Sequence, residues 1–291
     1  MKPAKFDYHC PATVDEAIAA LERHQGEARV LAGGQSLVPM MNFRLATPAA
    51  IIDLNRIPGL DKIELTDGTV IIGAMARQRR LEFAPVVAET LPLLNEALRW
   101  VGHLPTRTRG TIGGSIAHAD PAAEIPRVLQ ALSGEVVVRG TQGERRIAAP
   151  DLFVAPLTTA LEPDEILTEV RFPVIPPGAG YAIEEFARRK GDFAIAAIAV
   201  MLVREGERCA TAHLATAGIG PVSVRLSEAE NILKQRGLGE DAVAAAAQRA
   251  AELVEPMADH NASADFRRHL TGVLTRRAVL KARDRQNVRT G

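Results

Sequence analysis

Short apolar runs alternate with amphipathic stretches over the first part of the chain. A capping box at 13–16 is followed by apolar residues at helical spacing as far as Leu21. The mainly apolar segments 28–31 and 50–54, interrupted only by Arg29 and Asp53, predict a short strand and a buried strand after this helix. The pattern therefore indicates a small β/α unit over about residues 1–60.

Residues 61–175 mix strand and helix patterns. The dipeptide Asp67-Gly68 is a hairpin signal, and the β-branched run after it predicts a returning strand over 69–74. Apolar residues on one helical face predict a helix over 93–101. Further predicted elements are a helix over 125–132 and strands over 135–139 and 165–172.

The segment 173–180 holds three prolines and two glycines and is the clearest linker in the chain. We place the domain boundary there. The expected domains are 1–175, with subdomains of about 1–60 and 61–175, and 176–291.

The C-terminal part has an α+β pattern. We expect strands over 181–188, 194–203 and 208–217, and helices over 227–235, 240–253 and 263–283. In the last helix, positions spaced by four predict a buried stripe of Phe266, Leu270, Leu274 and Ala278. We interpret the arginines assigned to its outer face as solvated, with partner docking as the alternative; they are Arg267, Arg268, Arg276 and Arg277.

Composition narrows the function classes. The 35 basic and 35 acidic residues of this 291-residue chain cancel, so no nucleic-acid or membrane footprint is expected. No run approaches the ~20 apolar residues of a membrane span, and no apolar run at the start indicates a signal peptide. Cys10 and Cys209 are too few for a four-cysteine cluster in this chain, and they fit a reducing, cytoplasmic location.

Two glycine pairs, each followed closely by a serine, carry the candidate chemistry. They are Ala32-Gly33-Gly34-Gln35-Ser36 and Thr111-Ile112-Gly113-Gly114-Ser115. Successive backbone amides in such turns form concave anion sites, and glycine lets a ligand approach the main chain. Two such turns are suited to the two phosphates of a dinucleotide. Each taken alone is also an ordinary glycine turn.

The segments around these turns resemble the FAD-binding medium subunit of the molybdenum hydroxylases, the family of carbon monoxide dehydrogenase and bacterial xanthine dehydrogenase. The resemblance covers nearly the whole chain and rests on an ordered set of segments, namely 32–45, 52–60, 109–124, 164–167 and 188–194. It implies an α+β fold, with an FAD domain of the p-cresol methylhydroxylase type in two subdomains. A C-terminal domain with a small antiparallel sheet and helices is expected to follow.

The resemblance also implies roles for individual residues. Backbone amides of Ala32, Gly33, Gly34, Gln35 and Ser36, and of Thr111, Ile112, Gly113, Gly114 and Ser115, would wrap the FAD diphosphate. Glu124 would contact the flavin, or else be a helix-start carboxylate. Leu167 would touch the isoalloxazine, or else be plain core. Lys190 and Asp192 would lie near the isoalloxazine edge, or else in a surface turn.

The implied function is electron transfer through FAD. Electrons would come from two two-iron, two-sulfur clusters on a small partner subunit, and a large partner subunit would hold the molybdenum cofactor. The expected assembly is a heterotrimer or its dimer. No catalytic residue and no metal ligand are assigned to this chain. The alternatives are a free-standing FAD oxidoreductase and a scaffold subunit that has lost FAD.

Overall fold

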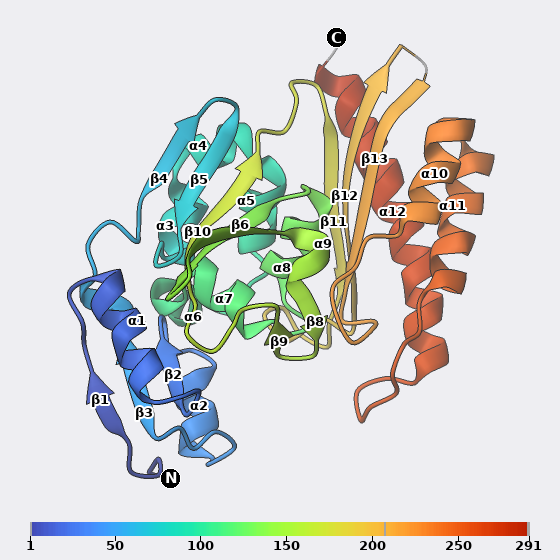
Figure 1. The fold of residues 1–291 in the computed structure, drawn as a ribbon. Helices are drawn as coiled ribbons and strands as arrows, with labels where there is room; N and C mark the ends of the chain where they lie inside the picture. Colours follow the sequence, from blue (N-terminus) through green and yellow to red (C-terminus); the bar gives the residue numbers. More distant parts are fainter. Residues whose placement is uncertain (1, 207, 290–291) are drawn as a thin grey trace.

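The computed structural model describes residues 2–206 and 208–289, and for 287–289 the backbone alone. Its elements form three successive units along the chain (Figure 1). The first unit, drawn in blue, is a parallel sheet of order β1-β3-β2. Its elements are β1 (Asp7–His9), α1 (Val14–Arg23), β2 (Ala28–Leu31), α2 (Leu37–Asn42), β3 (Ala50–Asp53) and a 3-10 turn (Leu54–Arg56). Thr13 caps α1 through its hydroxyl, as the capping box predicts.

The second unit is a five-stranded antiparallel sheet of order β4-β5-β10-β6-β7. Its strands are β4 (Ile63–Thr66), β5 (Thr69–Gly73), β6 (Glu135–Gly140), β7 (Gly143–Ala148) and β10 (Ile166–Pro173). The helices are α3 (Gln78–Phe83), α4 (Pro85–Thr90), α5 (Pro92–Leu98), α6 (Leu104–Arg109), α7 (Ile112–His118), α8 (Glu124–Ala131) and α9 (Ala149–Leu152). A short hairpin, β8 (Phe153–Ala155) and β9 (Thr158–Thr159), completes the unit.

The third unit is an antiparallel sheet of order β11-β12-β13 covered by three helices. The strands are β11 (Gly180–Phe186), β12 (Ala196–Glu205) and β13 (Arg208–Ala217), and the helices are α10 (Ser227–Arg236), α11 (Glu240–Leu253) and α12 (Ala264–Arg289). Figure 1 shows this sheet standing between the central helices and the orange-red helices α10–α12. The chain is thus a mixed α+β protein.

Strand β12 is buried on both faces, and its alternate residues belong to different cores. Ile198, Val200 and Leu202 pack into the core under α10–α12, whereas Ala199 and Met201 pack into the core of the second unit. Because successive side chains of a strand point to opposite faces, one apolar strand fills both cores. This sheet therefore fixes the third unit against the second.

The predicted buried stripe of α12 is confirmed at Leu270, Leu274 and Ala278 but is wrong at Phe266. Phe266 is 41% exposed, whereas Arg267 is buried. Twelve residues of helix turn through about 1200°, so Phe266 lies about 120° from Ala278 around the axis. The buried Arg267 donates from Nη1 to the carbonyl oxygens of Ile195 and Gly218, and from Nη2 to Asp259 at 2.8 Å. The remaining arginines of the predicted outer face, Arg268, Arg276 and Arg277, are exposed.

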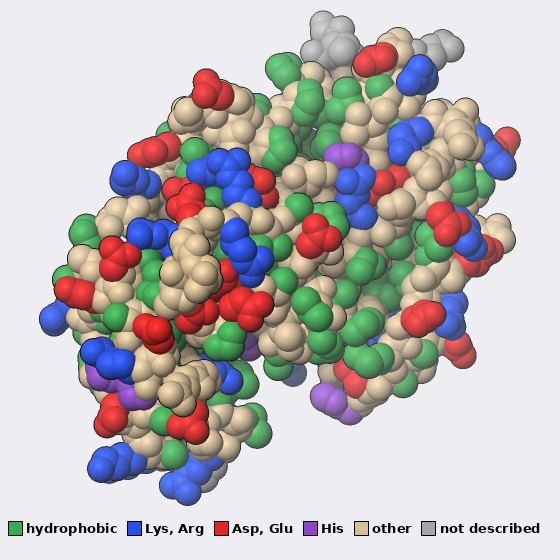
Figure 2. Space-filling view, viewed as in Figure 1, with side chains coloured by type: hydrophobic (Ala, Val, Ile, Leu, Met, Phe, Trp, Pro, Cys, Tyr) green, Lys and Arg blue, Asp and Glu red, His purple; other side chains and the backbone are tan. Residues whose placement is uncertain are grey.

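Several short helices were not predicted. The segments that form α2, α3, α4 and α6 are each only six residues long and show too little periodicity to be recognised. None of the helices in 2–206 and 208–289 is long and apolar enough to cross a membrane. Acidic and basic side chains are interspersed over the face in Figure 2, as the net charge of zero leads one to expect.

We expect Gly180→Ala to destabilise the fold. Strand β11 crosses α12 at Gly180, and a Cβ there would overlap the carbonyl oxygen of Ala282 and lie 2.7 Å from Gln286 Cγ. Overpacking of this kind costs about 1–3 kcal/mol. Urea denaturation measures the loss. Gly239→Ala is the matched control, since a Cβ there meets nothing within 4 Å. An equal effect of both substitutions would contradict this account.

Candidate functional site

The first glycine loop connects β2 to α2 and has the backbone of an anion site. Gly34 has φ +72°, a conformation that glycine adopts without strain. Within the described ranges 2–206 and 208–289, the backbone amides of Gly33, Gly34, Gln35 and Ser36 donate no hydrogen bond. Four successive unpaired amides in a partly exposed turn can receive the oxygens of a diphosphate. The donor set of this loop therefore fits the phosphate part of FAD.

The second glycine sequence is the start of helix α7 and has a different role. Thr111 caps the helix: its hydroxyl accepts from the Gly114 amide at 3.0 Å, and its carbonyl accepts from Ser115 at 3.1 Å. The amides of Ile112 and Gly113 donate to the carbonyls of Ala76 and Ala74 at 3.1 and 2.9 Å. These four amides are bonded within the chain, and their contact with a diphosphate stays a prediction.

Gly113 explains why the second sequence needs glycine. A Cβ at this position would lie 2.5 Å from the Cβ of Ala74 and 2.8 Å from its Cα. The missing side chain lets α7 pack directly on the end of β5, so that its amides reach the strand carbonyls. This glycine serves packing between two elements, a use that sequence alone does not separate from ligand binding.

The structure brings the two glycine sequences side by side. A Cβ on Gly33 would overlap the carbonyl oxygen of Arg109 and lie 2.8 Å from the Cα of Gly110. A Cβ on Gly114 would lie 3.3 Å from the Cβ of Ala32. The first loop therefore rests on the backbone that leads into the second sequence.

Two residues that the sequence analysis did not single out join these segments. Asn55 donates from Nδ2 to the carbonyl oxygen of Ala32 at 2.9 Å. Arg77 donates from Nη2 to Asn55 Oδ1 at 2.5 Å and from Nη1 to the carbonyl oxygen of Arg109. Asn55 lies inside the segment 52–60 that carries part of the family resemblance, which was the available signal. Arg77 had none.

Glu124 is the first residue of α8 and is buried, 8% exposed. Its pKa is raised to about 7: desolvation is the largest cause, the nearby Glu185 carboxylate acts in the same direction, and Arg127 opposes them. Arg127 has a fully buried side chain, and its Nη2 lies 3.1 Å from Glu185 Oε2 on β11. This ion pair links the second unit to the third. Leu167 on β10 is buried in the core of the second unit.

Lys190 and Asp192 lie in the exposed turn between β11 and β12. The Asp192 amide donates to the Arg189 carbonyl at 3.1 Å. Between them, Gly191 packs on the segment before α6: a Cβ there would lie 2.7 Å from His103 Nδ1 and 3.0 Å from the carbonyl oxygen of Gly102. The turn therefore packs on the segment that leads into the second glycine sequence.

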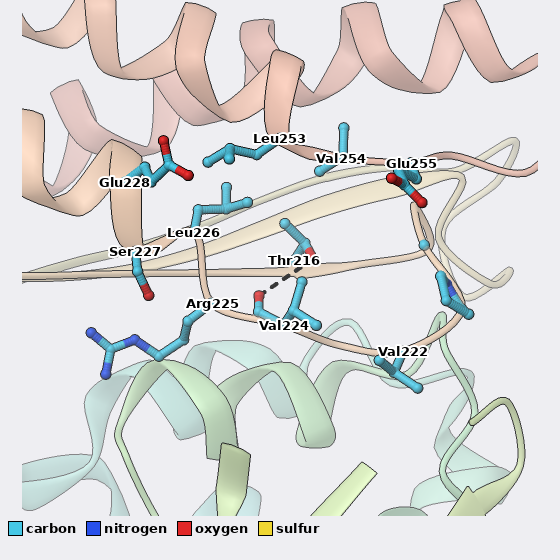
Figure 3. A pocket seen from close by; sticks show the side chains of 12 residues that line it. Thr216, Val222, Val224, Arg225, Leu226, Ser227, Glu228, Leu253, Val254 and Glu255 are labelled. Carbon is cyan, nitrogen blue, oxygen red and sulfur yellow. Dashed lines mark hydrogen bonds between the residues drawn. The ribbon is translucent and has the colours of Figure 1, made fainter. Parts of the chain in front are cut away.

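A shallow pocket of about 360 Å³ lies elsewhere, between the loop before α10 and the end of α11 (Figure 3). Its apolar lining includes Val222, Val224 and Leu253. Arg225 at its edge is already paired with Glu230 at 2.5 Å. None of the predicted site residues lines this pocket, so it is not the candidate FAD site.

The raised pKa of Glu124 predicts a pH-dependent stability. Between the ordinary carboxyl pKa of 4.5 and about 7, the folded chain keeps a proton that the unfolded chain releases. Stability of the flavin-free chain therefore falls as the pH rises through this window. In the wild-type chain we expect the free energy of unfolding to fall by on the order of 2–3 kcal/mol across this window, and Glu124→Gln should remove that fall. The remaining slope comes partly from Glu185, whose pKa burial also raises.

Urea denaturation at several pH values between 4.5 and 8 measures this slope. Glu89→Gln, at an exposed carboxyl of α4, is the control and should keep the wild-type slope. A wild-type slope in Glu124→Gln would show that Glu124 is not the titrating group.

Comparison with known proteins gives the family. Residues 4–175 match the FAD binding domain in molybdopterin dehydrogenase, and residues 181–282 match the CO dehydrogenase flavoprotein C-terminal domain. The chain is 40% identical over 283 residues to subunit alpha of the 6-hydroxypseudooxynicotine dehydrogenase complex of Paenarthrobacter nicotinovorans, covering 97% of this chain and 96% of that protein. It is 37% identical over 279 residues to the carbon monoxide dehydrogenase medium chain of Hydrogenophaga pseudoflava, covering 96% and 97%.

Solved structures agree with these relatives. A carbon monoxide dehydrogenase from Hydrogenophaga pseudoflava, which lacks the Mo-pyranopterin moiety of the molybdenum cofactor, matches with a TM-score of 0.96 at 38% identity over 98% of this chain and 99% of that one. Quinoline 2-oxidoreductase from Pseudomonas putida 86 matches with a TM-score of 0.92 at 36% identity, covering 98% and 99%. These matches confirm the resemblance and the fold class. The chain belongs to the molybdenum hydroxylase family and is one of its FAD-binding medium subunits, an oxidoreductase component.

Proposed function

We propose that the chain is the electron-transfer subunit of a molybdenum hydroxylase, and that its first glycine loop holds the FAD diphosphate. The observation that carries this proposal is the run of four unpaired amides from Gly33 to Ser36. The close packing of Gly33 on Arg109 and Gly110 supports it, because that contact holds the loop in one shape. The family match supplies the identity of the ligand.

Bound FAD supplies the redox chemistry, accepting electrons and passing them to an external acceptor. The residues of this chain bind and orient it. The second glycine sequence supports the first loop and offers the Ser115 hydroxyl. Glu124, Leu167, Lys190 and Asp192 are proposed to lie along the flavin. No residue of this chain acts as acid, base or nucleophile on the organic substrate.

The proposed partners follow from the relatives. Two of them are medium chains of carbon monoxide dehydrogenase, and another is a subunit of a dehydrogenase complex. We propose a large subunit with the molybdenum cofactor and a small subunit with two two-iron, two-sulfur clusters, in a heterotrimer or its dimer. We also propose the division into an FAD domain, 1–175 in two subdomains, and a C-terminal domain, 176–291.

The first test is the visible absorption spectrum of the purified chain, with the released cofactor identified after acid treatment. Oxidised-flavin maxima and released FAD are the expected result. A colourless chain that does not take up added FAD would overturn the proposal in favour of a scaffold subunit. Turnover of an organic substrate by the single chain would favour a free-standing FAD oxidoreductase instead.

We expect Gly33→Val and Gly114→Val to abolish stoichiometric FAD binding. A side chain at Gly33 displaces the backbone of Arg109 and Gly110, and one at Gly114 lies 2.7 Å from the capping Thr111 Oγ1. The first change separates the two glycine sequences. The second disturbs the cap of α7 and crowds the Cβ of Ala32, 3.3 Å away on the first sequence. The flavin-to-protein ratio after purification measures the loss, and Gly239→Ala should keep it at the wild-type value. Full flavin content in both valine variants would contradict the two-loop site.

A further inference from the structure

We propose that Asn55 and Arg77 are positioning residues for the diphosphate: together they clamp the first glycine loop to the backbone that precedes the second glycine sequence. This inference rests on the proposed function, since it assumes that FAD binds the first loop. It concerns residues that do not belong to either glycine sequence.

Asn55 holds the first loop from behind. Its Nδ2 donates to the carbonyl oxygen of Ala32 at 2.9 Å, directly before Gly33. The same amide group donates to Asp53 Oδ1 at 2.5 Å, and the Asn55 backbone amide donates to that oxygen at 2.9 Å. Asp53, which is 9% exposed, also accepts from Tyr8 at 2.6 Å. Asn55 is thus anchored to the end of strand β3.

The orientation of the Asn55 amide is determined by its partners. Two acceptors, Ala32 O and Asp53 Oδ1, face Nδ2, and one donor, Arg77 Nη2, faces Oδ1. Reversing the amide would place acceptor against acceptor and donor against donor, so one orientation satisfies every group. Asn55 therefore connects Arg77 to the first loop through two hydrogen bonds of its side-chain amide.

Arg77 holds the other side of the clamp. It precedes α3, and its two terminal nitrogens are divided between Asn55 Oδ1 and the carbonyl oxygen of Arg109. The backbone of Arg77 forms a β-bridge with Thr111, and the next residue, Gln78, donates from its amide to Gly110 O at 2.9 Å. The segment 77–78 is thus fixed to the second sequence through the main chain, and the Arg77 side chain reaches back to the first.

The charges at the clamp also suit an anion. Burial lowers the pKa of Arg77, and the charge of the neighbouring Arg109 lowers it further. The carboxylates of Asp53 and Asp61 act in the opposite direction, and a bound diphosphate would add further negative charge beside the two arginines. Because both terminal nitrogens of Arg77 are already bonded to protein acceptors, Arg77 is assigned a positioning role and not direct contact with phosphate.

The test measures binding of two ligands to the flavin-free full-length chain. One is FAD, and the other is ADP, which has the adenosine and the diphosphate of FAD but no flavin. The variants are Asn55→Ala, Arg77→Gln, their double variant and Arg77→Lys. Arg80→Ala is the matched control, because Arg80 lies on α3, directly after Arg77, and pairs with Asp61 at 2.8 Å. The melting temperature of each flavin-free variant is measured in parallel.

We expect each single variant to lower the affinity for FAD and for ADP by about tenfold or more, since a charge-assisted hydrogen bond in the clamp is lost. The double variant should be no weaker than the weaker single variant, because the two side chains act through one connection. Arg77→Lys should bind with intermediate affinity, and Arg80→Ala should bind as wild type. Melting temperatures of the flavin-free variants should stay close to that of the wild type.

Wild-type affinity in both single variants would overturn the clamp and leave the proposed function standing. Additive losses in the double variant would also overturn it, since they would mean that Arg77 contacts the ligand independently. Failure of the wild-type chain to bind FAD would instead overturn the proposed function itself.

Discussion

The structure of the site depends on a contact between two stretches of main chain. Gly33 lies so close to Arg109 and Gly110 that a single methyl group would separate them. Backbone packing at this distance requires glycine, and it also requires that the polar groups at the contact have partners. Arg77 supplies one of them by donating to the carbonyl oxygen of Arg109. The unpaired amides of the first loop are therefore presented by a rigid support.

The two glycine sequences differ in the hydrogen bonding of their backbone amides. In the first, the amides from Gly33 to Ser36 have no partner in the described part of the chain. In the second, the amides from Ile112 to Ser115 are all bonded to the chain, because Thr111 caps α7 and Gly113 lets that helix pack on β5. Ile112 and Gly113 of the second sequence lie at buried positions, whereas the residues with free amides in the first loop are partly exposed or exposed.

A buried ion pair joins the second unit of the chain to the third. Arg127 and Glu185 are both almost completely removed from solvent, and Glu124 lies near enough for its pKa to respond to both. Burial of three ionisable groups costs desolvation energy that one ion pair does not fully offset. The proton that Glu124 keeps near neutral pH reduces this cost by removing one negative charge. The shared sheet β11–β13 supplies the apolar contact around this polar group.

Local patterns in the sequence determined the elements that have strong periodicity or clear turn chemistry. The capping box at Thr13, the strands of the third unit and the family resemblance of 32–45 and 109–124 are such cases, since each depends on residues close in sequence. Tertiary structure decided the rest. The rotation of α12 exposed Phe266 and buried Arg267, because each step of four residues adds about 40° of rotation to the stripe. Only the folded chain shows that Thr111 begins a helix whose amides are occupied, and that Asn55 and Arg77 meet between the loops. The bonds of Asn55 and Arg77 to the loops and to each other join residues separated by 22 to 32 positions, and no local pattern encodes them.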